Sequence, residues 1–114
     1  MRYLLLIYGN EAGASQMTPE EDQAVMAAYL AFGEQHKEQI DGGDALQPTP
    51  AATTVRVREG KSLVTDGPFA ETKEQLGGFY TVKCDNLDQA IEIASHIPGA
   101  QHGSIEVRPI MEFN

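Results

Sequence analysis

The sequence predicts an α+β domain with the ferredoxin-like plan, in which one antiparallel sheet carries both helices on the same face. The first reason is the order of the signals along the chain: strand, helix, strand, hairpin, strand, helix, strand. This order is that of a split βαβ pair with an extra hairpin. The second reason is length, because 114 residues suit a single domain, spanning 1–114, with one core.

The first predicted strand is the run from Tyr3 to Tyr8, which is apolar at every position. A strand with one face in water alternates apolar and polar residues, whereas a continuous apolar run is typical of a central strand. The run is too short for the apolar core of a signal peptide or for a membrane helix. We therefore expect a buried central strand.

The first predicted helix begins at the segment Thr-Pro-Glu-Glu. Thr18 has the side chain of an N-cap residue, Pro19 is favoured at the first helical position, and Glu21 completes a capping box. We expect the helix to end near Glu38 and to cover one face of the sheet with an apolar stripe. This stripe consists of Val25, Tyr29 and Phe32, flanked by Met26, Ala28 and Leu30.

The middle of the chain contains the hairpin signal. Gly42-Gly43 is expected to end the first unit, and residues 45–47 are expected to form a short strand. Residues 53–58 then alternate in the manner of a strand, and the turn 59–61 leads into a returning strand over 62–66. The pattern predicts a hairpin inserted between the two halves of the fold.

The second half of the chain supplies a strand over 76–84, a helix and a final strand. The helix is capped by Asp85 or Asn86 and has ended by Pro98. Its apolar stripe consists of Leu87, Ala90, Ile91, Ala94 and Ile97. The final strand places Ile105, Val107, Pro109, Met111 and Phe113 on one face and Ser104, Glu106, Arg108 and Glu112 on the other. Its proline indicates a bulge or an unpaired edge.

Helices on one face of the sheet leave the other face bare. The strand from Tyr3 to Tyr8 has no polar side to offer to water. A second copy that packs sheet against sheet about a twofold axis is the simplest cover. We therefore predict a homodimer, in which each newly buried apolar side chain contributes about 1.5–3 kcal/mol before the costs of association.

The charge balance excludes several partners. Seventeen acidic residues against eight basic ones give a formal net charge of −9. This balance repels phosphate backbones and anionic lipid surfaces, so we expect neither direct nucleic-acid binding nor membrane association. The one cysteine, Cys84, cannot form an intramolecular disulfide, and we expect it to be buried and inert in a reducing cytoplasm.

Two long motifs carry a family resemblance: "DGPFAETKEQLGGFY" at residues 66–80 and "IPGAQHGSIEVRPIMEF" at residues 97–113. With the opening "MRYLLLIYGNE" and the "TPEE" helix start, the chain resembles the YCII-related family, specifically the group named for its Asp-Gly-Pro-Phe motif. The resemblance implies a dimeric α/β barrel of ferredoxin-like subunits and no established reaction. Members are often encoded near extracytoplasmic-function sigma factors, and the wider family is suspected of enzymatic activity around a His-Asp pair.

The positions that match the motifs of this group include the candidate site residues. In the first motif they are Asp66, Gly67, Pro68, Phe69, Glu71, Lys73 and Glu74. In the second motif they are His102, Gly103, Glu106 and Arg108.

Asp66 and His102 are the candidate catalytic residues. Asp66 lies in a tight turn, where its carboxylate either hydrogen-bonds the backbone or acts as a base or ligand anchor. His102 precedes the last strand, and histidine is the residue type that general acid/base chemistry uses most often. It is either an exposed loop residue or a general acid or base that Asp66 or Glu71 orients.

The candidate ligand-binding residues are Phe69, Glu71, Lys73, Glu74 and Arg108. The charged run 71–74 is bracketed by a tight turn and by Gly77-Gly78, and a diglycine permits close approach of a ligand or of another strand. The alternative for the charges is ordinary solvation on a loop. The alternative for Phe69 is a plug in the core.

We expect no metal and no cofactor, because the sequence has neither a metal-ligand spacing of His and Cys nor a glycine-rich phosphate loop. Two functions remain open. The first is a homodimer with a small-molecule cleft near the 66–78 loop that can perform acid/base chemistry. The second is a non-catalytic interaction or regulatory module that is functionally linked to an extracytoplasmic-function sigma factor.

Overall fold

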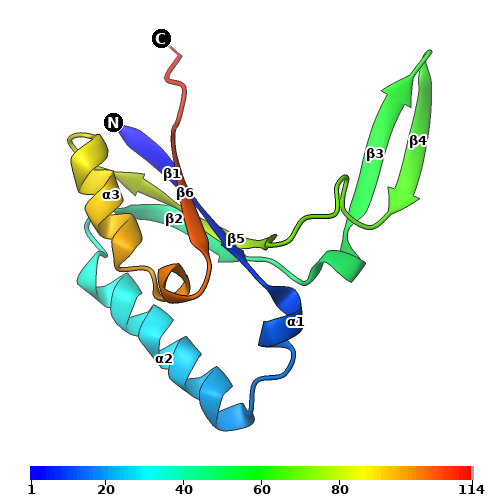
Figure 1. The fold of residues 1–114 in the computed structure, drawn as a ribbon. Coiled ribbons are helices and arrows are strands. Elements are labelled where there is room, and N and C mark those ends of the chain that lie inside the picture. The colour runs from blue at the N-terminus through cyan, green and yellow to red at the C-terminus, as the bar shows by residue number, and fades with distance from the viewer. Residues whose placement is uncertain (114) are drawn as a thin grey trace.

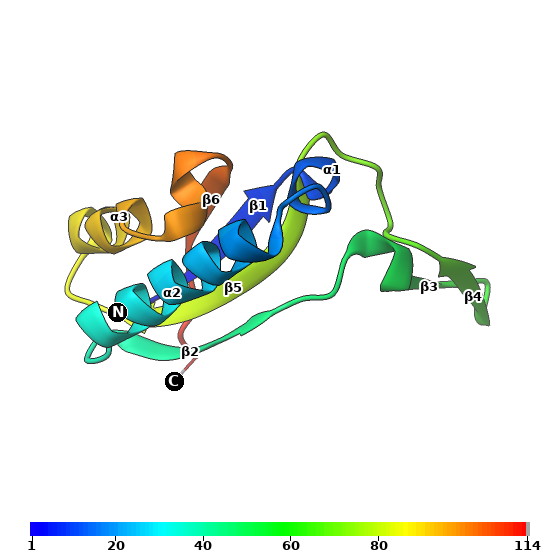
Figure 2. The ribbon, with the colours of Figure 1, turned by 90° about the horizontal axis from the view of Figure 1, so that it is seen from below.

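The computed structural model of the protein describes residues 1–113 and contains a four-stranded antiparallel sheet with two main helices on one face (Figures 1 and 2). The strands are β1 (Arg2–Gly9), β2 (Ile40–Ala45), β5 (Gln75–Lys83) and β6 (Ser104–Pro109). The helices are α2 (Pro19–Gln35) and α3 (Leu87–Ser95). The sheet order is β2-β5-β1-β6, so the predicted α+β class and ferredoxin-like plan are confirmed.

The shorter elements are α1 (Glu11–Ala14), the 3-10 helices η1 (Thr49–Ala51) and η2 (Pro98–Gln101), and the hairpin of β3 (Thr53–Arg58) and β4 (Lys61–Asp66). The hairpin confirms the prediction and forms a separate two-stranded sheet. Its turn uses left-handed backbone at Glu59 (φ 53°) and Gly60 (φ 76°), as a tight hairpin connection requires. Figure 1 shows the hairpin projecting away from the four-stranded sheet. We call residues 53–66 the arm.

Strand β1 is central, as predicted, and divides its apolar side chains between the two faces of the sheet. Tyr3 and Leu5 are buried beneath the helices. The core there consists of Tyr3, Leu5, Phe32, Val82, Cys84, Ala90, Ile93, Ala94 and Ile97. Leu4, Leu6 and Tyr8 point to the other face and stay only half-buried. Figure 2 shows both main helices on the first face, so we call the second one the open face.

The start of α2 follows the sequence prediction. Thr18 caps the helix, and its side chain and that of Glu21 form the reciprocal bonds of a capping box. Hydrogen bonds from Thr18 lower the pKa of Glu21 below its ordinary value. The helix ends at Gln35, three residues before the predicted end, because His36 takes a non-helical cap conformation.

The predicted apolar stripe of α2 covers the sheet only in part. Phe32 is buried and Tyr29 packs at the edge of the core. Val25, Met26 and Leu30, however, are exposed. The helix therefore contacts the sheet through its C-terminal half, and the expectation of a fully covered stripe was wrong.

The predicted short strand at 45–47 is also misplaced, because β2 runs through the glycines that were expected to end the preceding unit. The pairing of β2 with β5 shifts register at this point. A Cβ atom on Gly43 would lie 2.4 Å from the Phe79 carbonyl oxygen, and one on Gly78 would lie 2.9 Å from the Asp44 carbonyl oxygen. Gly43 and Gly78 thus allow two strands to approach each other, whereas a Cβ atom on Gly77 would meet only the Ile7 carbonyl oxygen, at 3.9 Å.

The remaining boundaries follow from caps and from proline. Asn86 caps α3 as predicted, and β5 ends one residue before Cys84. Cys84 is buried, as expected, and burial raises the pKa of its thiol. Strand β6 ends at Pro109, so the exposed Met111 and Phe113 do not extend its apolar face as predicted.

Candidate functional site

The two sequence motifs meet on the open face, at the end of the sheet nearest the arm. The Ser104 hydroxyl donates a hydrogen bond to Oε1 of Glu74 at 2.8 Å. Tyr8 of β1 pairs with Ser104 on one side and with Leu76 on the other. Because directly paired residues share a face, these side chains form one cluster. The sequence patterns singled out Glu74 but missed Tyr8 and Ser104 as its neighbours.

Farther along the open face, an ion pair joins Glu106 to Arg108 on β6. These two residues are opposite Leu6 and Leu4 of β1, and Leu6 is in turn opposite Phe79 of β5. The open face therefore combines an apolar strip in its centre with charges along β6. Arg108 lies on this face, as its alternation along the last strand predicts.

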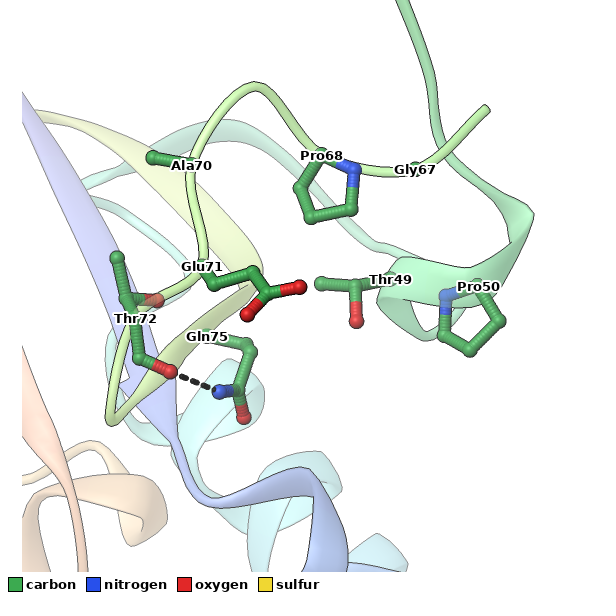
Figure 3. A pocket seen from close by; sticks show the side chains of 8 residues that line it. All are labelled: Thr49, Pro50, Gly67, Pro68, Ala70, Glu71, Thr72 and Gln75. Atoms are coloured by element: carbon green, nitrogen blue, oxygen red, sulfur yellow. Dashed lines mark hydrogen bonds between the residues drawn. The ribbon is translucent and has the colours of Figure 1, made fainter. Parts of the chain in front are cut away.

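A hollow of about 350 Å³ lies where the arm joins the body (Figure 3). It is lined by Thr49, Pro50, Gly67, Pro68, Ala70, Glu71, Thr72 and Gln75. Figure 3 shows the Glu71 carboxylate turned toward Thr49. The Gln75 side-chain amide donates to the Thr72 carbonyl oxygen at 2.5 Å and so holds one wall. Of the predicted site residues, only Glu71 lines this hollow.

Glu11 fixes the other wall of the hollow. Its carboxylate accepts hydrogen bonds from the Thr49 backbone N–H at 2.8 Å and from the Thr49 hydroxyl at 2.6 Å. Its own N–H donates to Oε1 of Gln75 at 3.0 Å. No local pattern singles out Glu11, because its bonding partners Thr49 and Gln75 lie 38 and 64 positions further along the chain.

The Asp-Gly-Pro-Phe turn is present, but its backbone rather than its aspartate holds it. Gly67 has a φ of +97°, and its N–H donates to the Ala52 carbonyl oxygen at 2.7 Å. The Thr54 hydroxyl donates to the Gly67 carbonyl oxygen at 2.8 Å. Asp66 is the last residue of β4, and its exposed side chain makes no hydrogen bond within the described residues. The expected bond from Asp66 to the turn backbone is therefore wrong.

Two other candidates of the loop lie in solvent. Phe69 is 79% exposed, so the alternative of a core plug is wrong. Lys73 is exposed as well. Both roles in ligand binding stay predictions.

His102 caps η2 and is exposed. Within residues 1–113, no hydrogen bond or ion pair joins its side chain to Asp66 or Glu71. Within one copy, then, no hydrogen bond or ion pair of the described residues joins the two predicted catalytic residues, and their roles stay predictions.

The sequence patterns missed a contact between two other histidines. His36 and His96 cap the C-terminal ends of α2 and α3, and their Nε2 and Nδ1 atoms lie 3.0 Å apart. Partial burial and the neighbouring His96 lower the pKa of His36, against the opposing effect of Glu92. Across the part of the chain that the structure describes, no group of three or more His, Cys, Asp or Glu side chains is placed to hold a metal ion. None of its helices has the length and apolar character that a membrane crossing requires.

Comparisons with known proteins extend these observations. The chain is 43% identical over 114 residues to the uncharacterized protein R00369 of Rhizobium meliloti (strain 1021), a match that covers 96% of this chain and 92% of that protein. The solved structure of 5-chloro-2-hydroxyhydroquinone dehydrochlorinase from Burkholderia phenoliruptrix AC1100, in complex with 2,5-dihydroxybenzoquinone, has a similar fold. The TM-score is 0.54 at 16% identity, and the match covers 99% of this chain and 96% of the dehydrochlorinase chain.

The dehydrochlorinase shares the fold of this chain, but their sequence identity is too low to transfer its reaction to this chain. The model of the YCII-related domain, by contrast, matches residues 1–114 and so includes both motifs that meet on the open face. The chain belongs to the YCII-related family.

Proposed function

We propose that the protein is a homodimer that binds a small molecule between its subunits, near the end of the sheet where the two motifs meet. The observation that carries this proposal is the open face. Its apolar side chains, Leu4, Leu6 and Phe79, lie beside the hydrogen-bonded Glu74–Ser104 pair on the same surface. Apolar groups favour a covered surface, and the polar pair gives a ligand directional contacts.

The dimer follows from the cost of leaving this face in water. Covering an apolar side chain stabilises an assembly by about 1.5–3 kcal/mol. A twofold arrangement covers the face of both copies with one interface. The end of the sheet with Tyr8 and Ser104 then borders a space between the subunits rather than bulk solvent.

The surroundings suit a small, partly unsaturated molecule with oxygen substituents. Tyr8 and Phe79 offer aromatic surface, Arg108 offers donors, and the Ser104 hydroxyl, whose proton goes to Glu74, offers an acceptor. The related fold of the dehydrochlorinase holds 2,5-dihydroxybenzoquinone, which supports the use of this fold for a ligand of that size. His102 is the proposed general acid or base, because it precedes β6 at this end of the sheet. Asp66 is the proposed partner of this histidine, and we propose that it comes from the second copy of the dimer. The proposed location of the protein is the cytoplasm.

Sedimentation and calorimetry test the proposal together. We expect the wild-type protein to sediment as a dimer and Leu6→Glu to sediment as a folded monomer. With 2,5-dihydroxybenzoquinone as the probe, we expect binding by the wild type and at least about tenfold weaker binding by Ser104→Ala. A wild-type monomer at all concentrations would contradict the dimer. Equal affinity of Ser104→Ala and the wild type would contradict the site.

A second function is supported by the loop that follows the arm. Phe69 is exposed there and offers a surface that a protein partner can recognise. The family resemblance suggests a regulatory module linked to an extracytoplasmic-function sigma factor as that partner's context. A co-purified sigma factor that is retained by the wild type and lost when residues 66–75 are replaced would support this function. Retention by both proteins would contradict a role for the loop.

A further inference from the structure

The arm has an apolar face that no other part of residues 1–113 covers. Val55 is opposite Val64, and Val57 is opposite Ser62, so the three valines share one face of the hairpin. Val55 is 60% exposed, Val57 is 59% exposed and Val64 is 65% exposed. The other face carries the cations Arg56, Arg58 and Lys61, together with Leu63.

A hairpin of this kind is poorly stable when both faces meet water. Two strands alone are marginal, and stable sheets gain a third strand or a packed face. The arm forms six residue pairs within itself, and its root is held by the bond from Gly67 to Ala52. It is thus shaped in advance, and an outside surface that covers the valines would stabilise it.

Charge indicates which outside surface covers the valines of the arm. The arm holds three cations, Arg56, Arg58 and Lys61, and two anions, Glu59 and Asp66, for a net charge of +1. The formal charge of the whole chain is −9, so the rest of the chain carries −10. The acidic body of a second copy therefore attracts the arm at long range, through cations on the face opposite the valines, whereas two bodies repel each other.

The shape of the chain places the arm within reach of a second copy. The radius of gyration is 16.1 Å, against about 13 Å for a compact chain of this length. The principal extents are 47 × 47 × 19 Å, so the molecule is broad and flat. Figure 2 shows the arm beyond the end of the sheet and clear of the helices.

We propose that the arm of each subunit clasps the other subunit of the dimer, with Val55, Val57 and Val64 at the contact. The inference rests on the proposed homodimer and goes beyond it, because the arm then contributes to the strength of the dimer. It also closes the hollow at the arm root from the side of the second copy.

The test compares two faces of the same hairpin. The double variant Val55→Thr/Val64→Thr keeps the β-branched shape and removes apolar contact from the valine face. Leu63→Thr is the matched control, because Leu63 is the neighbour of Val64 on the opposite face. Sedimentation gives the dimer dissociation constant of each protein. Hydrogen exchange of the amides in residues 53–66 is measured for the wild type over a range of protein concentrations.

We expect the double variant to raise the dissociation constant at least about tenfold, the control to leave it unchanged, and arm exchange to slow as the dimer forms. A wild-type dimer whose arm exchanges as fast as in dilute monomer, or whose dissociation constant is unchanged in the double variant, overturns the clasp and leaves the proposed function intact. An equal effect of the control overturns the assignment of the valine face. A wild type that stays monomeric contradicts both proposals.

Discussion

Ser104 and Glu74 are joined by a hydrogen bond of 2.8 Å, although they are 30 positions apart in the chain. Each belongs to a different motif of the YCII-related sequence pattern. The bond therefore shows that two motifs that are far apart in the chain meet on one surface. It also raises the question of whether this surface braces the fold or serves a ligand.

Ser104→Ala answers that question through stability. The bond is exposed to water, so its loss is expected to lower the free energy of unfolding by no more than about 1 kcal/mol. Urea unfolding measures the change, and Ser95→Ala, which removes another exposed serine bond in α3, is the reference. A much larger loss in Ser104→Ala alone would identify the pair as a structural brace.

Gly103→Ala is expected to destabilise the fold. A Cβ atom at this position would lie 2.0 Å from the Tyr8 carbonyl oxygen, in the backbone of the central strand. Overpacking of this kind costs about 1–3 kcal/mol or more. Thermal and urea unfolding report the loss. Gly33→Ala is the control, because nothing lies within 4 Å of its Cβ and alanine stabilises a helix interior by about 0.5–1 kcal/mol.

The two acids beside the hollow, Glu11 and Glu71, are expected to differ in how much they contribute to the stability of the fold. Glu11→Ala removes two hydrogen bonds to Thr49 and is expected to lower stability by about 1–3 kcal/mol and to speed amide exchange in η1. Glu71→Ala removes an exposed carboxylate and is expected to change stability by less than about 0.5 kcal/mol. Urea unfolding measures the stability of both variants, and hydrogen exchange measures the opening of η1. Equal losses of stability in Glu11→Ala and Glu71→Ala would contradict the expected difference.

Stability is expected to fall as the pH falls through the titration of His36. The pKa of His36 in the folded protein is lowered from the ordinary value of 6.5, chiefly by burial and next by His96. A group of this kind favours folding while it is neutral, so its contribution is present above pH 6.5 and declines below it. Urea unfolding at pH 7.5 and 5.5 measures the decline.

His36→Gln is expected to reduce this dependence on pH, whereas His102→Gln, at an exposed site, is expected to retain it. A decline of the same size in His36→Gln and in the wild type would assign the effect to other groups.

The fold was predictable where short-range chemistry decides the structure. The capping box at Thr18, the apolar run of β1 and the tight turn at Gly60 each act through neighbours in the chain. The boundaries of β2 were not predictable, because Gly43 is needed only when Phe79 of another strand lies against it. That requirement exists only in the assembled sheet.

The candidate site was predictable in part for the same reason. Alternation along β6 placed Arg108 on the polar face, and the loop pattern singled out Glu74. The partners Tyr8 and Ser104 carry no local signal, since the register between β1 and β6 alone brings them together. Glu11 was missed because its bonds to Thr49 depend on the path of the connecting segment.

Cys84 has a practical consequence for the study of this protein. Its thiol is buried in the core, and burial raises its pKa and so favours the protonated form, so alkylating reagents that attack thiolates should react with it slowly. A cysteine introduced on the surface would then be the single readily labelled thiol of the chain. Fluorescent or spin probes can thus be attached at a chosen position without first replacing a native residue.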